Sequence, residues 1–152
     1  MPESDASLTP RLHRAAEICA AQGVKLTELR EAVLRLILAA GEPVGAYTLL
    51  DRLRASHGNA KPPTVYRALD FLLGQGLIHR VERLNAFVGC HDEAGHAHAA
   101  QFLICRDCGR ATEIEDAAVE SAIARAAAAA GFRPARVTVE VDGVCSACSG
   151  GG

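Results

Sequence analysis

Apolar residues recur at helical spacing along the first half of the chain. In residues 28–40 they fall three and four positions apart, after Thr27, which can cap a helix, and before Gly41, which can end one. The same spacing predicts three further helices, over residues 8–22, 46–57 and 63–75. Two short apolar runs, 77–82 and 86–90, then predict a β-hairpin. Helices followed by such a hairpin are typical of a winged-helix domain.

The second half of the chain has a different pattern. Valines alternate with polar residues over 136–144, which predicts a strand with one buried face. Strands are also predicted over 101–105 and 111–115, and a helix over 117–130. We therefore expect an α+β protein, with an N-terminal winged-helix DNA-binding domain at residues 1–84 and a small α/β metal-binding dimerisation domain at residues 85–152. The exposed strand edges predict pairing with a second copy of the chain.

Composition and charge narrow the class of protein. The chain has 152 residues, 49% of them hydrophobic, but no apolar run approaches the roughly 20 residues that span a bilayer. Its first residues carry no apolar signal-peptide core, so we expect a cytoplasmic protein with no membrane partner. Residues 1–84 carry 11 Lys and Arg against 9 Asp and Glu, and residues 85–152 carry 5 against 9. This weak bias in charge fits DNA contact by the N-terminal half and cation binding by the C-terminal half.

Two identical cysteine pairs are the strongest chemical signal. Cys105 and Cys108 form one C-x-x-C turn, and Cys145 and Cys148 form the other. Each turn supplies two thiolates at a spacing that suits two corners of a tetrahedron, so the two turns together predict a closed, structural zinc site. A redox dithiol would use the same spacing, and zinc retained under mild oxidant would count against that alternative.

A second group of candidate ligands lies between the hairpin and the later strands. Four of the six histidines fall between residues 79 and 98, and they are His79, His91, His96 and His98. Cys90 lies among them and Glu113 follows. A mixed set of nitrogen, sulfur and oxygen donors suits zinc. Because these donors come from separated segments, a metal that bound them would fix one domain against the other, as a sensor requires. Surface histidines and a structural cysteine are the alternative interpretation.

The predicted helix over residues 63–75 is the second helix of a helix-turn-helix. Such a helix enters the major groove of DNA. Arg67 lies opposite its apolar stripe, and Tyr66 lies at the margin. An arginine on that face can reach a phosphate or a guanine edge, although an ordinary solvated arginine would show the same pattern.

Several longer segments resemble the ferric uptake regulator family, in particular its zinc uptake regulator branch. The resemblance covers about residues 10–148 and rests on LTELR (26–30), AKPPTVYRALDFLLGQGLIHRVE (60–82), FVGCH (87–91), FLICRDCG (102–109) and GVCSAC (143–148). It implies a winged-helix domain, a dimerisation domain and a homodimer that binds palindromic operator DNA when metal is bound. It also implies a transcription factor rather than an enzyme, with no small-molecule substrate.

The resemblance assigns roles to individual residues and implies two zinc ions per monomer. A structural zinc falls on Cys105, Cys108, Cys145 and Cys148. A regulatory zinc falls on His79, Cys90, His98 and Glu113, with His96 and His91 as possible auxiliary ligands. The DNA contacts fall on Tyr66 and Arg67, and we expect Thr64 and Lys61 beside them to contribute. The implied function is a repressor that silences zinc-uptake genes when zinc is abundant.

Two departures from the family pattern bear on the metal. The family often reads LTPQR where this chain has LTELR, and the HHDH-type segment of iron and peroxide sensors is replaced by CHDEAGHAH. Cys90 in place of a first histidine favours zinc over iron. An iron, manganese or peroxide sensor of the same family is the nearest alternative. A zinc hydrolase is the alternative from another class, and four protein ligands that leave no position for water argue against it.

Overall fold

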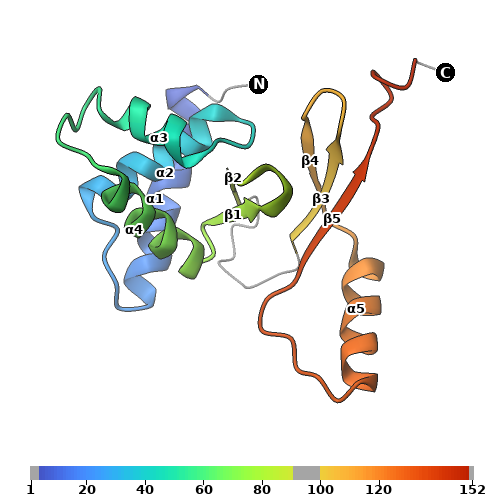
Figure 1. Cartoon of the computed structure of the whole chain (residues 1–152). Coiled ribbons are helices and arrows are strands. Elements are labelled where there is room, and N and C mark those ends of the chain that lie inside the picture. Colours follow the sequence, from blue (N-terminus) through green and yellow to red (C-terminus); the bar gives the residue numbers. More distant parts are fainter. Residues whose placement is uncertain (1–3, 91–99, 151–152) are drawn as a thin grey trace. The chain divides into compact units, whose positions relative to one another are not determined.

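The computed structural model describes residues 4–90 and 100–150 (Figure 1). The chain divides into two compact units, residues 1–96 and 97–152. Within the described residues, every helix is too short or too polar to cross a membrane. The predicted combination of a helical first part that ends in a hairpin and a mixed α/β second part is confirmed.

The first unit contains four helices and a small hairpin. Its elements are α1 (Asp5–Ala21), α2 (Glu28–Ala40), α3 (Ala46–Leu53), α4 (Pro62–Gly74), β1 (Ile78–Val81), the short 3-10 helix η1 (Glu82–Leu84) and β2 (Ala86–Gly89). The Thr27 side chain accepts a hydrogen bond from the Arg30 amide, and Gly41 ends α2 with φ of 64°. Both ends of α2 therefore form as the sequence predicts.

Helix α3 is shorter than the predicted range of 46–57. It ends at Leu53, and the chain then makes a tight turn in which the His57 amide donates to the Leu53 carbonyl at 2.8 Å. The Arg54 Nε atom donates to the Ala60 carbonyl at 3.2 Å and holds the chain in this turn. The turn brings the chain to the start of α4, where Pro62 and Pro63 occupy the first helical positions.

One hydrophobic core joins the helices of the first unit. It contains the apolar faces of all four, including Leu12 of α1, Ile37 of α2, Leu49 of α3 and Leu69 of α4. The hairpin covers this core because Ile78 and Phe87 belong to it and because Val44 pairs with Phe87 in an isolated bridge. The outer face of α4 is left for other contacts.

The hairpin between β1 and β2 lies wholly in the first unit. Its register pairs Ile78 with Gly89 and Val81 with Ala86. Asn85 closes the turn in the left-handed region, with φ of 47°. We expected a domain boundary after residue 84, which lies within this hairpin. The pairing of β1 with β2 keeps both strands in the first unit. The assignment of DNA binding to the first part of the chain, and of metal binding and dimerisation to the second part, stays a prediction.

The second unit is a three-stranded sheet with one helix. Its elements are β3 (Ala100–Cys105), β4 (Ala111–Ile114), α5 (Ala117–Ala129) and β5 (Thr138–Gly143), and the strand order is β4-β3-β5. The Asp116 side chain caps α5 by accepting from the Ala118 and Val119 amides. Strand β3 pairs antiparallel with β4 and parallel with β5. Because β3 and β5 run the same way, both end at the same edge of the sheet (Figure 1).

The apolar faces of the second unit are more exposed than the sequence predicts. Leu103 of β3 and Val141 of β5 are paired neighbours on one face of the sheet, and they are 43% and 50% exposed. No residue of α5 is buried, although its apolar side chains repeat at helical spacing. The predicted elements form, and Phe102 and Ile104 of β3 are buried, but among the described residues the pair of Leu103 and Val141 and the helix α5 stay exposed.

Candidate metal centre and DNA-facing helix

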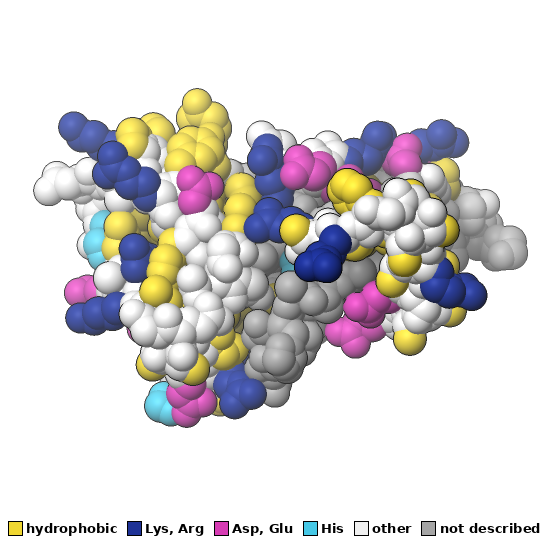
Figure 2. Space-filling view, turned by 90° about the horizontal axis from the view of Figure 1, so that it is seen from below, with side chains coloured by type: hydrophobic (Ala, Val, Ile, Leu, Met, Phe, Trp, Pro, Cys, Tyr) yellow, Lys and Arg dark blue, Asp and Glu magenta, His cyan; other side chains and the backbone are white. Residues whose placement is uncertain are grey.

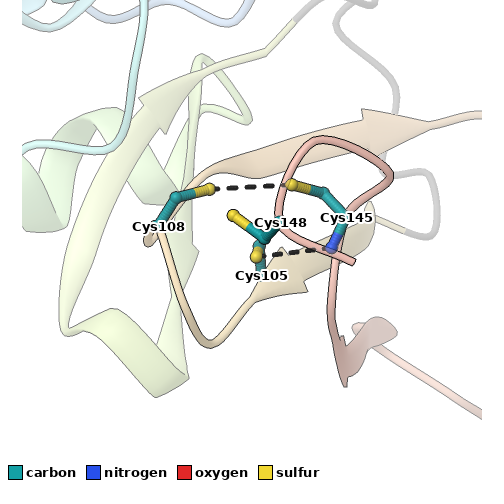
Figure 3. Close-up of side chains that lie close together, drawn as sticks. All are labelled: Cys105, Cys108, Cys145 and Cys148. Atoms are coloured by element: carbon teal, nitrogen blue, oxygen red, sulfur yellow. Dashed lines mark hydrogen bonds between the residues drawn. The ribbon is translucent and has the colours of Figure 1, made fainter. Parts of the chain in front are cut away.

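The four predicted cysteine ligands converge at one edge of the second unit. Cys105 is the last residue of β3, and Cys108 lies in the turn that follows. Cys145 and Cys148 lie in the turn after β5. Because Cys105 pairs with Gly143 in the parallel ladder, the two C-x-x-C turns lie next to each other. The four sulfur atoms all lie within 4.8 Å of one another and point toward a common centre (Figure 3).

The spacing of these sulfurs matches a tetrahedral site. Sulfurs that bind zinc at about 2.3 Å in a tetrahedron lie about 3.8 Å apart. The Sγ atoms of Cys108 and Cys145 are 3.8 Å apart. The Cys145 amide donates to the Cys105 Sγ atom at 3.4 Å, which is the amide-to-thiolate contact that a ligating sulfur accepts (Figure 3). The four residues therefore fit a thiolate-bound divalent cation.

Hydrogen bonds within the cluster shift the pKa values of two of the cysteines in opposite directions. Hydrogen bonds from the backbone amides of Cys145 and Cys108 lower the pKa of Cys105 to about 6. Hydrogen bonds with the side chains of Cys145, Cys108 and Cys105 raise the pKa of Cys148 to about 12, because its proton is shared with neighbouring sulfurs. Four thiolates this close would repel one another, and the positive charge of a bound divalent cation would offset that repulsion and so favour the loss of all four protons.

Backbone hydrogen bonds shape both cysteine turns. The Gly109 amide donates to the Cys105 carbonyl at 2.9 Å, with Gly109 in the left-handed region at φ of 74°. In the second turn the amides of Cys148 and Ser149 donate to the Cys145 carbonyl at 3.0 and 2.9 Å. The Arg106 amide donates to the Gly143 carbonyl at 2.9 Å and so links the two turns directly. These backbone hydrogen bonds therefore hold the two turns, and the sulfurs that they carry, next to each other.

The predicted regulatory ligands are divided between the two units. His79 lies on β1 and Cys90 directly follows β2, both half-buried in the first unit, while Glu113 is half-buried on β4 of the second. His98, and the auxiliary candidates His91 and His96, lie outside the described residues. The regulatory set therefore stays a prediction.

Two members of that set do share one face of the hairpin. His79 pairs with Val88, and the Cys90 amide donates to the Leu77 carbonyl at 3.0 Å, which extends the ladder by one pair. His79 and Cys90 are thus diagonal neighbours on the same face, a relation in which long side chains are within reach of each other. The Cys90 carbonyl also accepts from the Arg11 guanidinium at 3.3 Å, which ties this end of the hairpin to α1.

Helix α4 presents the predicted DNA contacts on its outer face. Val65, Ala68, Leu69 and Leu72 are buried in the core. Tyr66 is 48% exposed, Arg67 and Lys61 are exposed, and Thr64 is half-buried. These four residues lie in or just before the first two turns, which are the part of a recognition helix that meets base edges.

Sequence reasoning missed Tyr47, which lies beside this face. It is the second residue of α3 and is 77% exposed. Tyr47 and Tyr66 are the two tyrosines of the chain, and both line one small depression together with Leu50, Pro62 and Val65. The signal was present in the sequence, because Tyr47 lies off the apolar stripe of Leu49, Leu50 and Leu53. An exposed tyrosine hydroxyl can donate to a DNA phosphate.

The charged side chains of the described residues are dispersed. In the space-filling view, Lys and Arg side chains alternate with apolar and acidic ones over the visible face (Figure 2). This dispersion agrees with the net charge of −2. On the face seen in Figure 2, therefore, basic side chains are interspersed with others and do not form one broad basic field.

Comparison with known proteins gives a consistent result. Residues 21–142 match the model of the ferric uptake regulator family. The zinc uptake regulation protein of Escherichia coli (strain K12) is 44% identical over 137 residues, which are 90% of this chain and 80% of the relative. A zinc uptake regulator complexed with zinc and DNA is 41% identical, with a TM-score of 0.86 over 97% of both chains. The crystal structure of holo XcZur is 46% identical, with a TM-score of 0.80 over 91% of this chain and 96% of the other.

Proposed function

The chain belongs to the ferric uptake regulator family, and from this we propose that it is a zinc-responsive transcriptional repressor. In this proposal it binds operator DNA as a homodimer when loaded with zinc and silences zinc-uptake genes. The main observation behind this proposal is that the chain, which is similar to zinc uptake regulators, has both a four-cysteine cluster and an exposed face of α4 that bears Tyr66 and Arg67. The zinc hydrolase is disfavoured because the similar proteins are regulators and because four protein ligands at the second site would leave no position for water.

We propose two zinc ions per monomer with different roles. Cys105, Cys108, Cys145 and Cys148 would hold the first, which supplies a positive centre for four thiolates and joins the end of β3 to the end of β5. His79, Cys90, His98 and Glu113 would hold the second, with His91 or His96 as auxiliary ligands. Because its ligands would come from both units, the second ion would bind more tightly when the units are arranged so that all of the ligands reach it. Such a difference in affinity is what a ligand-driven switch requires. The soft thiolate of Cys90 favours zinc over iron or manganese.

The first experiment is a zinc titration with metal counted per monomer and DNA retention followed in the same samples. The DNA would be a duplex that the protein itself selects from a random-sequence pool in the presence of zinc. We expect one tight zinc that survives dialysis and a second, weaker zinc whose binding switches on DNA retention. DNA binding that ignores zinc, or that responds only to iron, would contradict the proposed function.

Replacing Arg67 by alanine is expected to weaken binding of that selected duplex. Arg67 is exposed on the outer face of α4, and a bidentate contact between arginine and a base contributes about 1–3 kcal/mol of discrimination. Fluorescence anisotropy with the selected duplex and its single-base variants measures both the loss and the relaxed preference at one base pair. Arg35→Ala is the matched control, since Arg35 of α2 pairs with Glu31 instead. Equal affinities of Arg67→Ala and wild type would rule out the contact.

The dimer is proposed to form through the second unit. Among the described residues β5 is an edge strand, and its Val141 forms an exposed apolar pair with Leu103 of β3. A second copy of the chain would cover this surface and pair the edge. The Ala-rich side of α5, which is not buried by the part of the chain that the structure describes, would add to the covered area.

Val141→Glu is expected to convert the dimer to a monomer without unfolding the chain. Val141 is 50% exposed in the single chain, so a carboxylate there meets water in the monomer and a desolvated apolar surface in the dimer. Thr138→Glu is the control, because Thr138 is exposed on the opposite face of the same strand. Sedimentation of both variants gives the mass, and a Val141→Glu protein that stays dimeric would place the interface elsewhere.

A further inference from the structure

We propose that Arg30 is a positioning residue for the recognition helix: its guanidinium, held by the backbone and stacked on Phe71, sets the rotation of α4 and hence where Arg67 points. This inference rests on the DNA binding proposed for α4. Arg30 belongs to α2 and has no place among the metal ligands or the DNA contacts described so far. Its role would be in sequence discrimination rather than in direct contact with DNA.

The contact between Arg30 and Phe71 joins two helices. The Arg30 Cζ atom lies 3.7 Å from the centre of the Phe71 ring, which is a close cation–π stack. Phe71 is half-buried and packs at the margin of the core, next to the buried stripe of α4 rather than within it. When a helix rotates about its own axis, a side chain at the margin of the core moves into or out of the core. A contact that fixes such a side chain therefore resists the rotation more than contacts in the centre of the stripe do.

The other side of the guanidinium is fixed as well. Arg30 Nη1 donates to the Lys25 carbonyl at 2.8 Å, in the segment between α1 and α2. The Arg30 amide is held by the Thr27 side chain at 3.4 Å in the cap of α2. The hydrogen bond to Lys25 therefore fixes the position of the guanidinium. Because the guanidinium is fixed, its contact with the Phe71 ring can restrain Phe71.

The position of Phe71 connects this anchor to the proposed DNA contact. Phe71 follows Arg67 by four residues on α4, so the two lie on the same side of the helix, one turn apart. Rotation or tilt of α4 that moved Phe71 away from Arg30 would move Arg67 with it. A bidentate contact with a base depends on such placement, whereas attraction to phosphates tolerates displacement.

The test separates positioning from a phosphate contact by Arg30 itself. Arg30→Met keeps an unbranched apolar stem and removes the charge and the donor, and Phe71→Leu keeps apolar bulk and removes the ring face. We expect each variant to bind the duplex selected by the wild type about tenfold more weakly, with a change of less than about twofold on a scrambled duplex and an unchanged salt dependence. The double variant is expected to lose no more than either single variant, since both remove one interaction.

Arg35→Ala, on the same helix but paired with Glu31, is the control and is expected to bind both duplexes as wild type does. Equal losses on both duplexes, together with a salt dependence reduced by about one phosphate contact, would show that Arg30 touches DNA and overturn the positioning role. Unchanged discrimination in Arg30→Met would overturn it too. A wild type that selects no sequence would overturn the proposed function and this inference together.

Discussion

Replacing Cys145 by serine is expected to abolish tight zinc binding and to unfold the second unit. Cys145 contacts two other members of the cluster: its sulfur lies 3.8 Å from that of Cys108, and its amide donates to the sulfur of Cys105. Serine keeps the hydrogen-bonding shape of the turn but does not supply a thiolate. Structural zinc in small domains contributes about 10–16 kcal/mol of apparent binding free energy at neutral pH, which exceeds the whole stability of most domains.

The burial of the second unit explains why the loss is expected to be so large. Its helix α5 has no buried residue and its sheet leaves Leu103 and Val141 exposed. The buried residues that the structure describes in this unit, such as Phe102 and Ile104, therefore all belong to β3. We therefore expect the proposed zinc and the dimer contact to add much of the stability. We expect Cys145→Ser to lose the dimer together with the metal.

Three measurements on purified Cys145→Ser check this result: zinc per monomer, thermal unfolding and mass in solution. Ser146→Ala, which alters the same turn between the two cysteines, is the control and is expected to behave as wild type. A Cys145→Ser protein with its full zinc content and an unchanged unfolding temperature would show that the cluster is not a metal site. Removal of zinc from the wild type by a strong chelator should reproduce the variant.

Replacing His79 by alanine is expected to have a different outcome: the chain stays folded and dimeric, keeps its first zinc and loses the response of DNA binding to zinc. His79 is on the hairpin of the first unit, remote in sequence from the cysteine cluster. Coupling between an effector site and a ligand site usually amounts to about 5- to 150-fold in affinity, so the zinc-dependent gain in operator affinity should shrink by that factor.

His13→Ala is the matched control for this experiment. His13 is a 77% exposed histidine of α1 whose ring lies 3.2 Å from Glu17, and it belongs to neither proposed zinc site. Zinc counting and operator titration would be done on both variants. If His79→Ala bound operator DNA as tightly as wild type at every zinc concentration, the regulatory assignment of His79 would be wrong.

Local signals in the sequence were enough for most elements. The caps of α2, the prolines that open α4 and the alternation that marks β5 are set by neighbouring residues, and they appear where predicted. The end of α3 was misjudged by four residues because it depends on a turn held by Arg54 and Ala60, which no periodic pattern reveals. The burial of α5 and β5 was overestimated because amphipathic spacing predicts which face is apolar, not whether the same chain covers it.

The candidate sites divide in a similar way. The spacing of the cysteines predicted the cluster, since each pair needs only its own turn, while the parallel pairing of β3 and β5 that brings the turns together emerged from the structure. The contact of Arg30 with Phe71 was invisible in the sequence because it joins residues 41 positions apart through packing alone. Tyr47 could have been found, since its position off an apolar stripe marks an outward side chain.

The parallel ladder between β3 and β5 also has a consequence for synthesis of the protein on the ribosome. Cys108 precedes Cys145 by 37 positions, so at about 5–20 residues per second the earlier pair waits about 2–7 seconds for the later one. During that interval the nascent chain carries a two-thiol turn that is open to soft ions such as Cu(I) and to oxidants. If zinc closes the site as proposed, we expect that chains made in a cell short of zinc leave this interval without it, so that zinc supply during translation affects how many of them mature.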